Sequence, residues 1–332
     1  MNIDHGMRPD PALQLAVTGD GRRAFLTRLW DQLWDAYRRR VPYARDYEQL
    51  IAQHGATFVN DHVAFRTLAS NSPQVGISCV SRIFESLGYT PAGCYNFPDK
   101  HLTAIHYQPA WPGLPKVFIS ELRVWELSSA CRAIVQATIA SHRKPLHLDT
   151  LATLATLDHS GSTGASPTDA GLLQQVVDHF QQLPWHIPEK DALQAVHEES
   201  QYAAWVLVHG YQVNHFTALI NAHGVPALES IEATVAALRG AGVPMKLEIE
   251  GAAGSKLRQT ATEAVSVEVD VRDASGQLTR IPWNYAYFEL AERGMVLDPA
   301  QGAPLRFEGF LGPQASQLFE MTGRGPAARS GH

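Results

Sequence analysis

The order of secondary-structure elements expected from the sequence occurs twice, and this repeat constrains the fold more than any other feature. From residue 57 the patterns predict a strand (57–68), a helix (73–87) and three strands, within "GYTPAGCYNF", "HLTAIHYQP" and "LPKVFISELRV". From residue 203 they predict a strand, a helix (227–242) and three strands, within "WVLVHGYQVNHFTALI", "ALESIEATVAALRGAG", "PMKLEIEG", "KLRQTATEAVSVEVDVRD" and "IPWNYAYFELAER". Each half therefore has the order β-α-β-β-β. Two such modules that pair their sheets form a half-open cup, so we expect an α+β fold.

The remaining segments lie around the two modules. A stripe of apolar residues at helical spacing predicts a helix over 21–40 with Asp20 as its N-cap, and a second helix over 43–54 ends at Gly55. The expected division is a disordered N-terminus (1–19), N-terminal helices (20–56), module 1 (57–125), a helical insertion (126–202), module 2 (203–295), a C-terminal closing segment (296–321) and a disordered tail (322–332).

The composition excludes several classes of function. The 332 residues are 45% hydrophobic and 18% charged, as in an ordinary globular protein, and the net charge of −6 favours neither nucleic acid nor an anionic membrane as a partner. Three scattered cysteines form no metal-binding or disulfide pattern. No run approaches the ~20 apolar residues of a membrane span, and the polar N-terminus is unlike a secretory signal. We therefore expect a cytoplasmic protein.

The first strands of the two modules share an Asn and a His, in "NDHVAF" and "VNHFTA". If an approximate twofold relates the modules, His62 and His215 face one cavity, and Glu289 in the last strand faces it too. Two imidazoles and one carboxylate on one side of a metal leave the opposite positions open, as in non-haem Fe(II) oxygenases. Such a site suits Fe(II), Mn(II) or Zn(II).

Glu121 offers an alternative ligand set. It occupies "ISEL", which echoes the "YFEL" that contains Glu289. With Glu121 as a fourth ligand, the site would be similar to that of a glyoxalase I, a metal-dependent isomerase that needs no O₂. The sequence does not separate these two sites, and a non-catalytic protein that binds a small anion is a third hypothesis.

Arg66 lies four residues beyond His62 on the same face of the expected strand. At ~3.3 Å per residue, the two backbones are about 13 Å apart. Because a guanidinium pairs bidentately with a carboxylate, Arg66 could hold one end of a small dicarboxylate whose other end is at the metal. The alternative is an ion pair with Asp61, Glu121 or another acid at the rim of the sheet.

The motifs "HGATFVNDHVAFRTL", "FISEL", "KLRQTATEA" and "YFELAERG" resemble those of the 2-oxoadipate dioxygenase/decarboxylase family, also called 2-hydroxyglutarate synthases. The resemblance covers most of residues 22–320. It implies a vicinal-oxygen-chelate fold and Fe(II) held by His62, His215 and Glu289, with Arg66 on the substrate. The segment "GFLGPQASQLF" matches only loosely the family's closing segment, so the chain length of the substrate stays open.

The implied reaction is 2-oxoadipate plus O₂ giving 2-hydroxyglutarate plus CO₂, a step of lysine catabolism. The cofactor would be Fe(II), and the small-molecule partners would be a 2-oxo dicarboxylate and O₂. Gln259, in "KLRQT", is a candidate second polar contact to the substrate.

Overall fold

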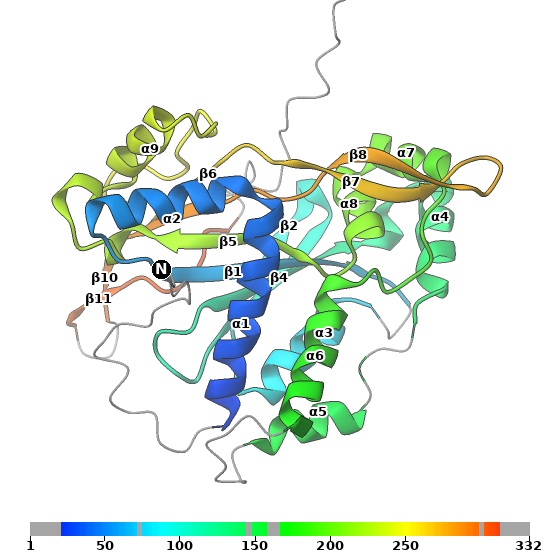
Figure 1. Cartoon of the computed structure of the whole chain (residues 1–332), viewed down its shortest axis with the longest axis horizontal. Helices are drawn as coiled ribbons and strands as arrows, with labels where there is room; N and C mark the ends of the chain where they lie inside the picture. Colours follow the sequence, from blue (N-terminus) through cyan, green and yellow to red (C-terminus); the bar gives the residue numbers. More distant parts are fainter. Residues whose placement is uncertain are drawn as a thin grey trace, which may run out of the picture.

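The computed structural model describes residues 21–71, 75–143, 146, 148–157, 167–298 and 302–312, with no side chains for 167–169. A curled sheet of seven strands forms its centre (Figure 1), in the order β2-β3-β4-β1-β5-β9-β6. The strands are β1 (Asn60–Ala69), β2 (Thr90–Phe97), β3 (Leu102–Gln108), β4 (Lys116–Arg123), β5 (Val213–Leu219), β6 (Leu257–Ala261) and β9 (Glu289–Arg293).

The two modules meet where β1 and β5 pair antiparallel. On either side of this seam the arrangement repeats, since β1 pairs parallel with β4 and β5 pairs parallel with β9. Each first strand is followed by a helix, α3 (Ile77–Ser86) in module 1 and α9 (Ile231–Gly240) in module 2. The expected α+β fold with two related modules is therefore confirmed.

The second module departs from the expected strands at its start. Residues expected to begin a strand at Trp205 belong instead to helix α8 (Gln201–His209), and β5 begins only at Val213. The Ser200 side chain caps α8 by accepting a hydrogen bond from the Ala203 amide, and Gly210 ends the helix with φ of 61°. The apolar run within α8 is buried on all sides, so its sequence has no period that separates helix from strand.

The later strands of module 2 also differ from expectation. The "PMKLEIEG" segment does not form the expected strand. It makes two isolated β-bridges, Met245 to Thr262 and Glu250 to Gln259. The expected long strand from Lys256 divides into β6 and β7 (Ser266–Arg272), and β7 forms a separate hairpin with β8 (Leu278–Asn284). The two parts differ in burial, since β6 is buried along its whole length whereas β7 and β8 leave outward-facing residues exposed.

Helices cover the sheet. Helix α1 (Gly21–Arg40) buries its apolar stripe against the sheet, where the Trp34 ring contacts Phe216 of β5 edge-on. Helix α2 (Pro42–His54) ends as expected at Gly55, whose φ of 63° is left-handed. The other elements are α4 (Ser129–Ala140), α5 (Leu148–Ala155), α6 (Pro167–Gln181), α7 (Lys190–Glu199), β10 (Met295–Leu297), β11 (Pro304–Arg306) and the 3₁₀ turns η2 (Pro98–Lys100), η3 (Val124–Glu126), η5 (Ile220–Ala222) and η6 (Pro226–Leu228).

Helices α4 to α8 fill the interval between the modules where the sequence predicts a helical insertion. The predictions for Asp20, for residues 1–19 and for 322–332 lie outside the described residues. In the part of the chain that the structure describes, no helix is long and apolar enough to cross a membrane.

Candidate metal centre

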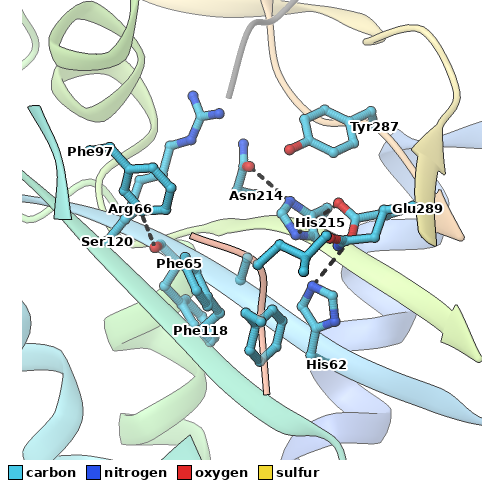
Figure 2. Close-up of a pocket in the computed structure, with 14 residues that line it drawn as sticks. His62, Phe65, Arg66, Phe97, Phe118, Ser120, Asn214, His215, Tyr287 and Glu289 are labelled. Atoms are coloured by element: carbon cyan, nitrogen blue, oxygen red, sulfur yellow. Dashed lines mark hydrogen bonds and ion pairs between the residues drawn. The ribbon is translucent and has the colours of Figure 1, made fainter. Parts of the chain in front are cut away.

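The structure brings together one side chain from each of three adjacent strands, His62 of β1, His215 of β5 and Glu289 of β9 (Figure 2). The His62 Nε2 lies 3.4 Å from Glu289 Oε1, and the His215 Nε2 lies 3.4 Å from Glu289 Oε2. One ligand atom from each residue lies within 4.8 Å of the others, and all three side chains are buried. The Thr217 hydroxyl lies 3.1 Å from His62 Nε2. The three residues thus form a compact group that can hold one metal ion.

The residue before each histidine orients its ring. Asp61 Oδ2 lies 2.8 Å from His62 Nδ1, and Asn214 Oδ1 lies 3.0 Å from His215 Nδ1. Each Nδ1–H therefore donates to its neighbour, and each Nε2 carries the lone pair that faces Glu289. Burial alone would raise the pKa of the Asp61 carboxyl, but the charge and hydrogen bonds of Arg293 hold it well below its usual range. Asp61 and Asn214 are therefore counterparts, whereas Asn60, the asparagine of the module 1 element, lies one residue earlier.

Burial sets the protonation of the group when no cation is bound. It lowers the pKa of both imidazoles, which are thus neutral, and raises the pKa of Glu289 to about 8. The Gln259 amide donates a hydrogen bond of 2.7 Å to Glu289 Oε1. Two neutral imidazoles and a carboxylate, with no thiolate among them, fit a divalent cation of borderline softness. Gln259 lines the cavity and orients this carboxylate, and its contact with a substrate stays a prediction.

The strand register corrects the expected pairing of Glu121 with Glu289. In module 2, Thr217, two residues after His215, pairs with Glu289. In module 1, Ala64, two residues after His62, pairs with Phe118. The counterpart of Glu289 is therefore Phe118, three residues before Glu121.

Glu121 instead corresponds to Glu292, and each of the two carboxylates binds the N-terminus of a helix. Glu121 Oε2 accepts a hydrogen bond of 2.8 Å from the Ile77 amide at the start of α3, and Glu292 Oε2 accepts one of 2.8 Å from the Ile231 amide at the start of α9. A carboxylate stabilises a helix N-terminus because it satisfies a free amide and complements the helix dipole. The candidate fourth ligand therefore lies at a helix start and outside the three-residue group.

A cavity lies beside the three residues. Ala64 and Arg66 continue the line of His62 along β1, so the alternation expected for this strand places all three at the cavity. The other lining residues are Phe65, Phe97, Phe118, Ser120, Asn214, His215, Gln259, Tyr287, Glu289, Phe310 and Leu311. The cavity is thus apolar on several walls, with polar groups at both ends.

The Arg66 guanidinium is buried and held by aromatic residues. Its Cζ lies 5.0 Å from the Tyr202 ring centre and 5.3 Å from that of Trp205. Burial lowers the pKa of the guanidinium, and the charge of Tyr287 and a hydrogen bond to it limit this fall. The acids weighed as its ion-pair partners bind elsewhere, Asp61 to Arg293 and Glu121 to the start of α3. Arg66 lines the cavity, and it stays a candidate to bind an anion there.

Several residues of the site were not predicted. Asn214 could have been found from the shared element before each histidine. Tyr287 stacks on the His215 ring at 4.9 Å, and Phe310 meets the His62 ring edge-on at 4.7 Å. Both reach the site through the tertiary fold, and no local pattern in the sequence marks them.

The chain is similar to known proteins that share one family name. The family model described as 2-oxoadipate dioxygenase/decarboxylase matches residues 29–304. The chain is 30% identical to the chloroplastic/amyloplastic 2-oxoadipate dioxygenase/decarboxylase of Oryza sativa subsp. japonica, over 95% of this chain and 82% of that protein. It is 29% identical to the chloroplastic 2-oxoadipate dioxygenase/decarboxylase of Arabidopsis thaliana, over 90% of this chain and 78% of that protein.

Solved structures share the fold. The hydroxyglutarate synthase of Oryza sativa in complex with 2-oxoadipate matches with a TM-score of 0.70 and 26% identity, over 92% of this chain and 96% of that chain. A putative hydrolase from Shewanella frigidimarina matches with a TM-score of 0.65 and 31% identity, over 86% and 97% of the two chains. A putative glyoxalase superfamily protein from Ralstonia eutropha, at 23% identity and a TM-score of 0.76 over 93% and 91%, shows the glyoxalase-like fold alone.

Proposed function

The chain belongs to the 2-oxoadipate dioxygenase/decarboxylase family, and we propose that it is an Fe(II)-dependent enzyme that converts 2-oxoadipate and O₂ to 2-hydroxyglutarate and CO₂. The observation that carries the proposal is the buried group of His62, His215 and Glu289 at one end of a cavity whose lining includes the guanidinium of Arg66. A metal group at one end and a fixed cation at the other suit a 2-oxo acid that carries a second carboxylate.

The three protein ligands leave room for substrate. When bound, Fe(II) supplies the chelation of a 2-oxo acid and the activation of O₂. Phe118 occupies the place in module 1 that a fourth carboxylate ligand would need, so the open positions stay available. This phenylalanine also counts against the O₂-independent isomerase hypothesis, which requires that ligand.

Arg66 fixes the far carboxylate. Its fork of N–H donors matches a carboxylate, and the rings of Tyr202 and Trp205 limit its motion. The apolar side chains of Phe97, Phe118 and Phe310 exclude water around the carbon chain of the substrate. The residues of the cavity therefore contribute orientation, because the 2-oxo acid end of the substrate lies at the metal group while Arg66 holds the carboxylate at the other end.

Two finer parts of the proposal rest on the sequence alone. A role in lysine catabolism follows from the family resemblance. The cytoplasmic location stays a prediction from composition, and both plant relatives carry names that place them in plastids.

An oxygen electrode tests the proposal with the purified protein, Fe(II) and a series of 2-oxo acids. We expect O₂ uptake with 2-oxoadipate and an equal release of CO₂, weak uptake with the monocarboxylate 2-oxohexanoate, and none with His62→Ala protein. Consumption of 2-oxoadipate at an equal rate without O₂ would support a lyase or isomerase. Binding of 2-oxoadipate without any turnover would support a binding protein.

A further inference from the structure

Arg293 is a buried arginine at the end of β9, four residues beyond Glu289. Its Nε lies 2.5 Å from Asp61 Oδ1 and its Nη2 lies 2.7 Å from Asp61 Oδ2, so the two side chains form a bidentate pair across the sheet. Both side chains are fully buried. Because Asp61 also accepts the Nδ1–H of His62, Arg293 fixes the group that orients a candidate metal ligand.

The remaining nitrogen of the same guanidinium binds a different part of the chain. Arg293 Nη1 donates to the carbonyl oxygens of Phe307 at 2.9 Å and Gly309 at 2.8 Å. We call residues 304–312, which contain both carbonyls, the strap. Lys116 also joins the strap to Asp61 through ion pairs, because its Nζ lies 2.5 Å from Glu308 of the strap and 3.7 Å from Asp61.

The strap closes one side of the cavity. The Phe310 ring lies 4.7 Å from the His62 ring and 5.0 Å from the Phe118 ring, centre to centre, and Leu311 also lines the cavity. One face of His62 is therefore covered by the strap, while its Nδ1 is held by the carboxylate that Arg293 also holds.

In the part of the chain that the structure describes, the corresponding residues of module 2 differ from those of this network. Asn214, which orients His215, is an amide where module 1 has the carboxylate of Asp61. Since Glu292 corresponds to Glu121, the counterpart of Arg293 is Leu122. Within the described residues, the ion pair thus supports His62, the histidine that lies beneath the strap.

We propose that Arg293 is a positioning residue that couples the seating of the strap to the orientation of His62, so that strap closure and metal binding strengthen each other. The proposal deepens the proposed function, on which it rests, because it names the residue that joins the closure of the cavity to its metal group. The coupling is reciprocal, since whatever the strap adds to metal affinity, the metal adds to strap stability.

Co(II) binding and amide hydrogen exchange test this coupling without turnover. In wild-type protein, we expect Co(II) to slow exchange in residues 304–312. In Arg293→Gln protein, we expect Co(II) to bind about 10- to 100-fold more weakly, the usual effect of losing a residue that supports a ligand. We also expect exchange in the strap to be fast and no longer slowed by Co(II).

Arg258→Gln is the matched control. Arg258 lies on the neighbouring strand β6 and pairs with Glu232 and Glu292, away from Asp61, so its loss should change neither Co(II) affinity nor exchange in the strap. Arg293→Lys keeps the charge without the fork of N–H donors, so its Co(II) affinity and its exchange in the strap should be intermediate. If circular dichroism shows that Arg293→Gln protein does not fold, Arg293→Lys replaces it in the test.

Wild-type Co(II) affinity in the Arg293 variants, or equal protection of the strap by Co(II) in wild-type and variant proteins, would overturn the proposal. Its failure is distinct from that of the proposed function. A protein that shows the coupling but no O₂ uptake with 2-oxoadipate would keep the positioning role and lose the assigned reaction.

Discussion

His62 and Arg66 both line the cavity because β1 presents alternate side chains to it. The residue between them on that face is Ala64, and its small side chain leaves the space between the metal group and the guanidinium open. Under the proposed function, the length of this gap would suit a short dicarboxylate, and the charge of Arg66 would suit an anion at the far end.

Arg66→Ala removes the anchor for the far carboxylate. Hydrogen bonds to a charged group contribute about 1.5–3 kcal/mol, so we expect KM for 2-oxoadipate to rise by roughly 10- to 150-fold. The preference for 2-oxoadipate over 2-oxohexanoate should fall by a similar factor, which steady-state O₂ uptake with each acid measures. A variant that keeps the wild-type preference would show that another group holds this carboxylate.

The carboxyl of Glu289 should make the metal-free protein sensitive to pH. Because burial raises its pKa from 4.5 to about 8, the protonated form favours the folded state. This contribution is fully present below pH 4.5 and is lost as the pH rises through about 8. Relative to Glu289→Gln, metal-free wild-type protein should therefore become less stable between pH 5 and pH 8, as urea unfolding at several pH values would measure.

The same titration governs metal binding, because the carboxyl must lose its proton to become a ligand. We expect wild-type affinity for Co(II) to increase from pH 6 to pH 8. A stability difference from Glu289→Gln that is flat over this range would mean that Glu289 is already ionised in the metal-free protein.

Among the elements, the last strands of the two modules decide what kind of metal site forms. Phe118 of β4 and Glu289 of β9 occupy equivalent positions beside the seam between β1 and β5. One module therefore supplies a histidine and a carboxylate, and the other supplies a histidine alone.

Phe118→Glu would place a carboxylate at the vacant ligand position. We expect the variant to bind Co(II) or Zn(II) at least as tightly as wild type while its O₂ uptake with 2-oxoadipate falls at least 10-fold, because an open position is filled. Phe118→Leu is the control for lost aromatic packing, and it should keep most of the activity. Undiminished turnover in Phe118→Glu protein would show that this position does not face the metal.

Glu121→Gln should affect the helix and leave the metal group intact. Its carboxylate satisfies the first amide of α3, so we expect a loss of about 0.5–2 kcal/mol in the free energy of unfolding. Chemical denaturation measures this loss, and metal titration should show wild-type affinity. Weaker metal binding at unchanged stability would restore Glu121 as a ligand.

The sequence predicts the elements better than their register. Helix, strand and repeat patterns locate the modules, and the Asn–His element locates both histidines. The similarity of "ISEL" and "YFEL" aligns Glu121 with Glu289, which is three residues away from the true alignment. The register is set by the pairing of Ala64 with Phe118 and of Thr217 with Glu289. Such pairings join residues distant in sequence, so no local pattern reveals them.

For the whole molecule, the candidate site exists only when both modules and the strap come together. His62 and His215 belong to different modules, and Arg293 ties the strap to the seam between them. This explains why the ligand types could be predicted from sequence, whereas Tyr287, Arg293 and Phe310 could not. Their roles depend on packing between segments that are far apart along the chain.

The fate of both oxygen atoms of O₂ tests the assigned reaction for the molecule as a whole. Conversion of 2-oxoadipate to 2-hydroxyglutarate and CO₂ releases the C1 carboxylate with its original oxygens, so both atoms of O₂ must enter the product. With ¹⁸O₂ and Fe(II)-loaded protein, mass spectrometry should show 2-hydroxyglutarate heavier by four mass units, one label in the hydroxyl group and one in a carboxylate. Product without label, or product formed in the absence of O₂, would contradict the assignment of this chain as a dioxygenase.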